Sequence, residues 1–241
     1  MSLRYRRILL KLSGEVLGGK AGFGIDPEGL KIVAAPVRVA VELGAQVGLV
    51  VGGGNIFRGS DPNIVSDRVP ADYMGMLATI INALAVQGEL LRQRLSCIVM
   101  SSIVIPQVTL PFGARMARDY LEEGYVVVFA GGTGNPYFTT DTAAALRALE
   151  IEADILIKAT KVGGIYDKDP VLFDDAEFFA ELDYDMVLER NLKVMDSTAV
   201  SLCRDSNLEM SVLDIHDENN IRLLLTGSPV GSIVAARRRV V

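Results

Sequence analysis

Short apolar runs rich in β-branched residues alternate along the chain with longer segments in which apolar positions recur at helical spacing. The apolar runs predict strands at residues 6–12, 46–51, 97–100, 125–130, 155–158, 210–213 and 232–236. The longer segments predict helices at residues 27–43, 71–94, 113–123, 140–150, 184–190, 197–205 and 219–225. Several strands are apolar on both faces, which is typical of buried parallel strands. The alternation predicts an α/β fold, a three-layer sandwich with a central, mostly parallel sheet.

Two further features refine this picture. Pro36 lies inside the first predicted helix and is expected to kink or split it. The chain has 241 residues, of which 50% are hydrophobic, and no internal repeat or linker rich in Pro, Gly or Ser divides it. We therefore expect a single domain over residues 1–241.

Charge and rare residues limit the possible functions. The net charge of -6 disfavours nucleic acid as a partner, and the basic triplet 237–239 is expected to be a solvated chain end. No window reaches the roughly 18 uninterrupted apolar residues of a membrane span. Cys97 and Cys203 lie in apolar stretches, so they are expected to be reduced, buried residues of a cytoplasmic protein. The single histidine, His216, is expected in an exposed loop, which argues against a Ser-His-Asp hydrolase.

The end of the first predicted strand carries a near match to a phosphate-binding P-loop. Residues 14–21 read G-x-x-x-x-G-K-A, whereas a P-loop ends in Ser or Thr and passes directly into a helix. Here AGFGIDPEG follows the lysine, so Lys20 is expected to be a loop residue and the fold is not a P-loop fold. Lys11 ends the apolar strand itself, where a buried ammonium group would cost several kcal/mol unless it were paired. From its position alone, Lys11 either reaches solvent or faces an anion.

Three other glycine-containing segments begin where predicted strands end. They are VVGGGNIFRG at 50–59, FAGGTGNPYFTTD at 129–141 and KATKVGGIYDKDP at 158–170. The helix that follows the second segment is expected to be capped by Thr140 or Asp141. Ligands of open α/β sheets bind at the carboxyl edge of the strands, and glycine backbones and helix amino termini suit phosphates there. The convergence of four such segments on one edge predicts an anion-binding site.

Seven strings, in order and spacing, carry a resemblance to a known family. They are KLSG, GFGID, GGGNIFRG, DYMGMLAT, GTGNPYFTTD, IEADILIKATKVGGIYDKDP and LKVMD. From about Arg6 to the final strand, the sequence closely resembles the bacterial uridylate kinases of the amino-acid kinase superfamily, which are unrelated to the P-loop kinases. The resemblance implies transfer of the γ-phosphoryl group of magnesium-bound ATP to UMP, giving UDP and ADP, in pyrimidine nucleotide biosynthesis. It also implies a homohexamer. We expect no permanently bound cofactor and no protein metal site, and charge and hydropathy argue against nucleic-acid and membrane partners.

The resemblance assigns roles to residues of this chain. Lys11 would stabilise charge on the transferring group, Asp141 would hold that lysine, and Arg58 and Asp196 would complete the catalytic set. ATP would be bound by Lys11, Leu12, Ser13, Gly14, Gly54, Arg58, Thr160, Tyr166 and Asp169. UMP would be bound by Gly53, Asp72, Thr133, Gly134, Asn135, Pro136, Tyr137, Phe138, Thr139 and Thr140, with Asp72 on a ribose hydroxyl.

Regulation and two departures from the family pattern stay open. The segment Gly19, Lys20, Ala21, Gly22, Phe23, Gly24 matches a loop associated with allosteric GTP, and UTP is a second candidate effector. The helix near residues 87–94 lacks the arginine and histidine pattern of strong GTP responders. Gly163 stands where relatives more often carry an aspartate.

Two alternatives to a UMP kinase stay open at this point. A catalytically silent nucleotide-binding protein of the same fold could keep the glycine loops and lose Lys11 or Asp141, but both are present. A carboxylate or carbamate kinase of the same superfamily is disfavoured by the GTGNPYFTTD string.

Overall fold

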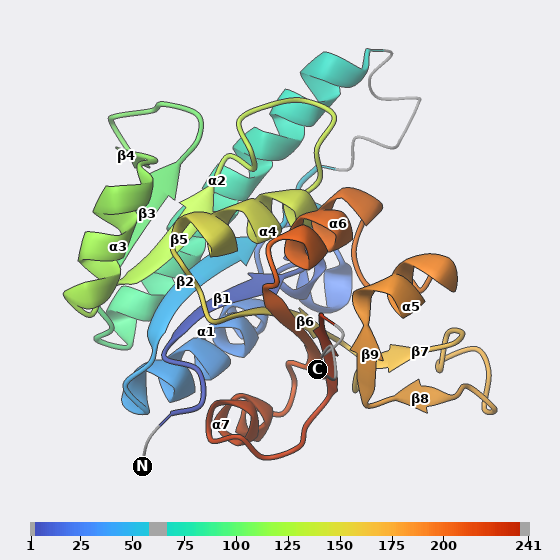
Figure 1. The fold of residues 1–241 in the computed structure, drawn as a ribbon. Coiled ribbons are helices and arrows are strands. Elements are labelled where there is room, and N and C mark those ends of the chain that lie inside the picture. The colour runs from blue at the N-terminus through green and yellow to red at the C-terminus, as the bar shows by residue number, and fades with distance from the viewer. Residues whose placement is uncertain (1–2, 58–66, 237–241) are drawn as a thin grey trace.

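The computed structural model describes residues 3–57 and 67–236, which fold into a sheet between two layers of helices (Figure 1). The nine-stranded sheet has the order β4-β3-β5-β2-β1-β6-β10-β11-β9, and its neighbouring strands are parallel except for β10 and β11. Its strands are β1 (Arg7–Leu12), β2 (Gln46–Val51), β3 (Cys97–Ser101), β4 (Leu110–Pro111), β5 (Val126–Ala130), β6 (Ile155–Thr160), β9 (Glu181–Asp183), β10 (Glu209–Asp214) and β11 (Ser232–Ala235). The three-layer fold with a mostly parallel sheet is thereby confirmed.

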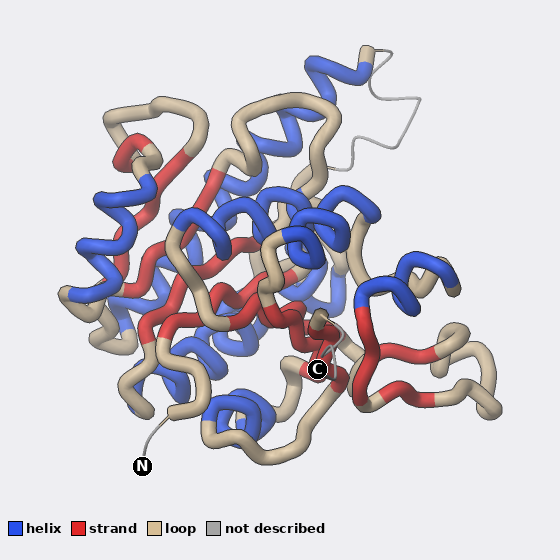
Figure 2. Tube along the Cα trace, in the orientation of Figure 1, coloured by secondary structure: helices blue, strands red, loops and turns tan. Residues whose placement is uncertain are grey.

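Helices cover both faces of this sheet, as Figure 2 also shows. The first face carries α1 (Pro27–Glu42), α2 (Arg68–Arg92) and α7 (Asn219–Leu225). The second face carries α3 (Ala114–Glu122), α4 (Thr140–Glu150), α5 (Tyr184–Glu189) and α6 (Ser197–Asp205). A separate hairpin of β7 (Ile165–Tyr166) and β8 (Phe178–Phe179) projects beside the sheet.

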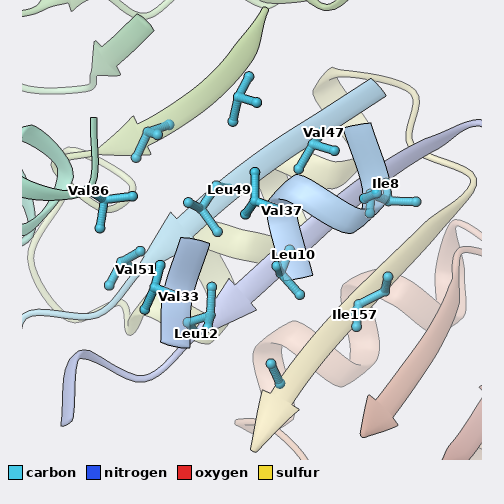
Figure 3. Close-up of a cluster of buried hydrophobic side chains, with 14 of the residues drawn as sticks. Ile8, Leu10, Leu12, Val33, Val37, Val47, Leu49, Val51, Val86 and Ile157 are labelled. Carbon is cyan, nitrogen blue, oxygen red and sulfur yellow. The ribbon is translucent and has the colours of Figure 1, made fainter. Parts of the chain in front are cut away.

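Each central strand divides its side chains between two cores because successive residues of a strand point to opposite faces. Along β1, Ile8, Leu10 and Leu12 pack in the core on the α1 side (Figure 3). Leu9 packs in the core on the α4 side. Lys11 has the same parity as Leu9, so the strand pattern directs this lysine toward α4.

The predicted helices and strands are all present among the described residues, with ends that differ by a few positions. Four short strands, β4, β7, β8 and β9, were not predicted. The expected split at Pro36 is wrong, because α1 continues through it. Pro36 removes one backbone hydrogen bond, but Val33, Val37 and Ala40 on the same helix are buried against the sheet. This packing outweighs the roughly 3 kcal/mol penalty of an interior proline.

The expectations about the two cysteines and the histidine are met. Cys97 and Cys203 are free and buried, and His216 is exposed. The basic triplet 237–239 lies outside the described residues. Helix α2 is long and apolar enough to cross a membrane by length and composition, but half of its most apolar window is buried inside the protein.

Candidate active site

Two lysines stand side by side at the carboxyl end of the sheet. β1 and β6 are parallel neighbours, and their register pairs Lys11 with Lys158. Leu9 and Leu156, two residues before each lysine, both pack in the core on the α4 side. The pleat therefore brings both ammonium groups to the same face of the sheet, where their repulsion requires a negative charge between them.

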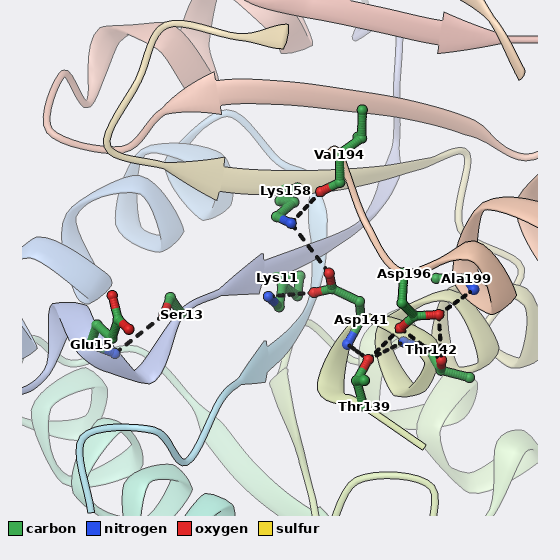
Figure 4. Close-up of polar contacts among 10 residues, drawn as sticks. All are labelled: Lys11, Ser13, Glu15, Thr139, Asp141, Thr142, Lys158, Val194, Asp196 and Ala199. Carbon is green, nitrogen blue, oxygen red and sulfur yellow. Dashed lines mark hydrogen bonds and ion pairs between the residues drawn. The ribbon is translucent and has the colours of Figure 1, made fainter. Parts of the chain in front are cut away.

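Helix α4 supplies this negative charge. Asp141 lies in its first turn and forms ion pairs with Lys11, at 2.5 Å between Nζ and Oδ1, and with Lys158, at 3.2 Å between Nζ and Oδ2 (Figure 4). Lys158 also donates a hydrogen bond to the carbonyl oxygen of Val194. The expected contact between Lys11 and Asp141 is present, and Lys158 is a third member of the cluster that the sequence analysis did not assign a role.

The cap of α4 differs from the expectation. Thr139, not Thr140 or Asp141, is the N-cap, because its hydroxyl accepts hydrogen bonds from the backbone N–H groups of Asp141 and Thr142. The side chain of Asp141 is thereby released from capping and is used for the two lysines. The ion pairs of Asp141 fix the start of the helix against the sheet.

Burial and charge act in opposite directions on the cluster. Burial would raise the pKa of Asp141, but the ammonium groups of Lys11 and Lys158 outweigh it and hold this pKa below its ordinary value. Burial lowers the pKa of Lys158, and repulsion from Lys11 adds to this effect, while Asp141 opposes it. Asp141 is therefore ionised at neutral pH.

The cluster lies where the chain leaves the sheet toward opposite faces. After β1 the chain passes to α1 on the first face, and after β6 it returns to α5 and α6 on the second. In open α/β sheets the crevice at the carboxyl ends of two such strands is the usual ligand site. The positive charge of Lys11 and Lys158 makes this crevice suited to a phosphate or another anion.

A large cavity opens on the β6 side of the cluster. It has a volume of about 740 Å³, and its lining includes Lys158, Thr160, Tyr166 and Asp169. The last three were expected to bind ATP, and the volume lies within the roughly 300–1,000 Å³ of small-molecule sites. The lining also includes 191–194, a segment that the sequence analysis did not single out.

A smaller cavity of about 140 Å³ opens between α2 and the loop before α4. Its lining contains most of the residues that were expected to bind UMP, namely Gly53, Asp72, Thr133, Asn135, Phe138, Thr139 and Thr140. Gly134, Pro136 and Tyr137 are not part of the lining. Because Thr139 and Thr140 directly precede Asp141, and Lys158 lines the larger cavity, the charged cluster lies between the two cavities.

Asp72 already has partners within the protein. Both of its carboxylate oxygens lie 2.8 Å from Nε of Arg68, and Oδ2 accepts a hydrogen bond of 2.7 Å from the backbone N–H of Tyr137. Tyr137 has a φ of +71°, a left-handed conformation that is uncommon for residues other than glycine. Asp72 therefore connects α2 to the loop before α4.

Asp196 is not in contact with Lys11 or Asp141 through any hydrogen bond or ion pair that the described residues form. It caps α6 by accepting a hydrogen bond from the backbone N–H of Ala199. It also accepts hydrogen bonds from the hydroxyls of Thr139 and Thr142. Figure 4 shows this second set of contacts beside the lysine cluster. Asp196 thus joins the amino termini of two helices, and its charge also acts on Lys158, whose pKa it raises against the effect of burial.

The loops after β1 and β2 approach each other closely. A Cβ atom on Gly14 would lie 2.3 Å from the carbonyl oxygen of Gly52, so only glycine fits at position 14. Two buried amides that the sequence analysis missed hold this region, because Asn55 and Asn82 exchange hydrogen bonds and Asn82 also donates to the carbonyl oxygen of Gly52. A polar residue directly after three glycines was the available signal.

The other residues expected at the ATP site have different surroundings. The side chain of Leu12 is fully buried in the core, so Leu12 can meet a ligand only through its backbone. Ser13 and Gly14 follow it at the strand end, with Ser13 capping a short 3-10 helix, and Gly54 lines the smaller cavity instead of the larger one. Arg58 lies outside the described residues.

The proposed effector loop 19–24 is exposed for most of its length, and α1 begins only at Pro27. Lys20 lies in a short 3-10 helix, Gly19–Ala21, and not in the loop expected from the sequence. No α-helix directly follows this lysine, which agrees with the rejection of a P-loop. Among the residues that the structure describes, no group of three or more His, Cys, Asp or Glu side chains is arranged to hold a metal ion.

Comparisons with known proteins agree with this architecture. Residues 6–214 match the amino acid kinase family. The chain is 36% identical to the UMP kinase of Bacillus anthracis, with a TM-score of 0.93 and 97% of each chain covered. It is 37% identical to the UMP kinase of Ureaplasma parvum, with a TM-score of 0.88 over 96% of this chain and 99% of that one. The uridylate kinase of Archaeoglobus fulgidus is 27% identical, with a TM-score of 0.70 over 95% of this chain and 99% of that one.

Proposed function

This chain belongs to the amino acid kinase family, and we propose that it transfers the γ-phosphoryl group of magnesium-bound ATP to the 5′-phosphate of UMP, giving UDP and ADP. One observation carries the proposal: a largely buried Lys11-Asp141-Lys158 cluster lies between two cavities in a chain that matches solved UMP kinases over nearly its whole length. The product would enter pyrimidine nucleotide synthesis.

The chemistry of phosphoryl transfer explains why such a cluster is needed. Donor and acceptor are both anionic, so the protein must align them and neutralise their repulsion, and it has little covalent chemistry to perform. Lys11 and Lys158 supply positive charge, and Asp141 keeps their ammonium groups in fixed positions before the nucleotides bind. A charge that is preorganised in a partly dry site stabilises the transition state more than a mobile one does.

The two cavities differ in size, and each would take one of the two nucleotides. The cavity of about 740 Å³ is large enough for ATP, and Thr160, Tyr166 and Asp169 would surround its adenosine. UMP would enter the smaller cavity, whose lining includes Thr133 and Asp72. Asp72 would exchange its contact with Arg68 for a ribose hydroxyl. Magnesium would arrive with the phosphates of ATP, and Arg58 would add positive charge on the ATP side.

The two alternative functions predict different outcomes in one assay. ADP release is measured with ATP and, in parallel, UMP, CMP, AMP, GMP, aspartate and carbamate. Strong turnover with UMP and weak turnover with CMP supports the proposal. Turnover with aspartate or carbamate alone would identify the carboxylate or carbamate kinase. Nucleotide binding without ADP release in the presence of any of the acceptors would identify the silent protein.

A second comparison tests the role of Asp72. We expect dUMP to be a poorer acceptor than UMP, because a site that pairs a ribose hydroxyl leaves its own polar group unpaired when the hydroxyl is missing. The measurement is kcat/KM for both nucleotides. Equal values would rule out the assignment of Asp72 to the ribose, whereas the proposed reaction itself would stand.

Assembly, location and regulation belong to the same proposal. Helix α2 exposes Tyr73, Met74, Leu77, Ile81 and Leu91 by 41–52% of their surfaces, and an apolar helix face of this kind supports association into a homohexamer. Sedimentation of the purified protein measures its mass directly. We place the enzyme in the cytoplasm and take the exposed loop 19–24 as the candidate GTP site, which GTP and UTP titrations of the kinase activity test.

A further inference from the structure

The loop of residues 131–134, here called the acceptor loop, packs closely against residues at the end of β3. Gly131, Gly132 and Gly134 have φ values of +74°, +57° and +82°. A Cβ atom on Gly131 would lie 2.8 Å from Oγ of Ser101, and one on Gly134 would lie 3.1 Å from Cβ of Ser102. The acceptor loop therefore packs against the end of β3 and the residue that follows it. On the other side of the loop, Gly132 and Thr133 line the smaller cavity, here called the acceptor cavity.

A buried arginine lies behind this loop. Arg147 on α4 is only 4% exposed, and its Nη2 donates a hydrogen bond of 2.7 Å to Oγ of Ser102. The hydroxyl of Ser102 in turn donates a hydrogen bond of 2.9 Å to the carbonyl oxygen of Gly132. Arg147 Nη2 lies 3.5 Å from the same carbonyl. A short polar chain thus leads from the guanidinium group to the backbone of the acceptor loop.

The other contacts of Arg147 fix its orientation. The guanidinium carbon lies 3.6 Å from the centre of the Phe112 ring, and Nη1 forms an ion pair with Glu150. A planar guanidinium group that is stacked and hydrogen-bonded in this way has little freedom to turn. Burial of an arginine is costly unless its charge and its N–H groups have partners. Ser102, Glu150 and Phe112 are these partners for Arg147.

The surroundings of the loop give it room to move if this support is lost. Ser102, Phe112, Thr133 and Arg147 all line a hollow of about 300 Å³ behind the loop. Thr133 lines both this hollow and the acceptor cavity, so it forms the wall between them. Glycine-rich backbone has high conformational entropy, and a loop that is held before binding loses less of it when the ligand arrives.

We propose that Arg147 is a positioning residue that sets the conformation of the acceptor loop, and through it the affinity for the acceptor nucleotide. The inference rests on the proposed UMP kinase function. Arg147 acts through Ser102 and Gly132, and its role is separate from that of the lysine cluster, with which it shares only helix α4. Loss of Arg147 should therefore change acceptor binding more than turnover.

The test compares two arginine variants of the full-length protein. Arg147→Met removes the guanidinium group behind the loop. Arg118→Met is the matched control, because Arg118 also contacts the end of α4, donating to the carbonyl oxygen of Glu150 and pairing with Glu152. Among the described residues, Arg118 forms no hydrogen bond or ion pair with the acceptor loop. Steady-state kinetics gives KM for UMP, KM for ATP and kcat, and titration calorimetry gives the Kd of UMP.

We expect Arg147→Met to raise both KM and Kd for UMP by about tenfold, the factor that corresponds to one lost hydrogen bond from a charged donor. KM for ATP and kcat should stay within about threefold, which is less than 1 kcal/mol. Arg118→Met should leave all four values near those of the wild type. Arg147→Lys should not restore UMP affinity, because an ammonium group cannot stack and form the same fork of hydrogen bonds.

Other outcomes separate the possible failures. An unchanged Kd for UMP in folded Arg147→Met overturns the positioning role and leaves the UMP kinase function intact. A wild-type protein that does not bind UMP overturns both. If Arg147→Met does not fold, Ser102→Ala replaces it, since this variant keeps the guanidinium group and removes the hydroxyl that reaches Gly132. A rise in the Kd of UMP supports the role, and an unchanged Kd overturns it.

Discussion

The lysine cluster and the lobe beside the larger cavity are built in opposite ways. Lys11 and Lys158 extend from central strands, their side chains are 9% and 20% exposed, and Asp141 holds both from the start of α4. Residues 161–183, here called the donor lobe, contain only the two-residue strands β7 and β8 before the chain rejoins the sheet at β9. Val171 and Leu172 in this lobe are 78% and 73% exposed.

This difference predicts how substitutions in the two regions act. The cluster is fixed by the sheet before any nucleotide binds, so a change there should lower kcat by orders of magnitude. The donor lobe is held by local turns and a small hairpin. A change there should alter KM for ATP by a small factor and leave kcat almost unaffected.

The largest effect is expected for Lys11→Met. The fold should remain intact because methionine fills a similar volume, but kcat should fall on the order of a hundredfold or more, since the charge facing the transferring phosphoryl group is lost. Circular dichroism and steady-state kinetics with UMP measure both properties. Lys31→Met, which changes an exposed lysine on α1, is the control. Normal turnover by folded Lys11→Met would leave Lys11 with a structural role only.

Asp141→Asn should lower kcat to a similar extent, because both lysines lose the charge that fixes them. It should also lower the melting temperature, since removal of one partner from a buried ion pair costs about 3–5 kcal/mol. Asp183→Asn is a matched control. Asp183 is the N-cap of α5, where it accepts a hydrogen bond from the backbone N–H of Met186, away from the cluster. A loss of stability with unchanged kcat in Asp141→Asn would reduce Asp141 to a structural residue.

The pH dependence of activity tests Lys158. Its pKa is below the ordinary 10.5, so the protonated form that neutralises the phosphates is lost as the pH rises through this lowered value. We therefore expect kcat/KM for ATP to fall on the alkaline side below the pH of an ordinary lysine. In Lys158→Arg the guanidinium group stays charged, and the fall should move to higher pH. Identical alkaline limbs in both proteins would assign the fall to another group.

The same contrast explains what the sequence could predict. The seven longer strands and the helices follow from apolar runs of four or more residues and from helical periodicity, both of which are local signals. The strands β4, β7, β8 and β9 have two or three residues each, too few for any periodicity. Their pairing with distant strands creates them, so they cannot be found from local sequence.

The site was predictable where a residue type was unusual for its position, as for a lysine at the end of a buried strand. Lys158 carried the same signal, but its pairing with Lys11 depends on the register of β1 and β6, which joins residues far apart in the chain. Thr139 and Thr140 are chemically equivalent candidates for the cap, and only the backbone geometry distinguishes them. Asp196 was identified through the LKVMD string, but its contacts with Thr139 and Thr142 depend on the tertiary fold. Arg147 acts through tertiary contacts that no motif encodes.

The smallest effect is expected for Gly163→Asp in the donor lobe. A Cβ atom at this position would have the Tyr166 hydroxyl as its nearest neighbour, at 3.6 Å, so an aspartate fits without displacing the backbone. Its negative charge would weaken the attraction for the ATP phosphates, whereas its lower backbone entropy would reduce the cost of ordering the loop. Each effect is worth no more than about 1 kcal/mol on the scale of exposed charges and glycine substitutions.

Gly164 is the contrasting position, because a Cβ atom there would lie 2.4 Å from Oγ of Ser232. We therefore expect KM for ATP to change by less than about tenfold in Gly163→Asp, with kcat nearly unchanged. A large rise in kcat would give this position a chemical role and would place part of the catalytic machinery in the donor lobe, against the division between the two regions.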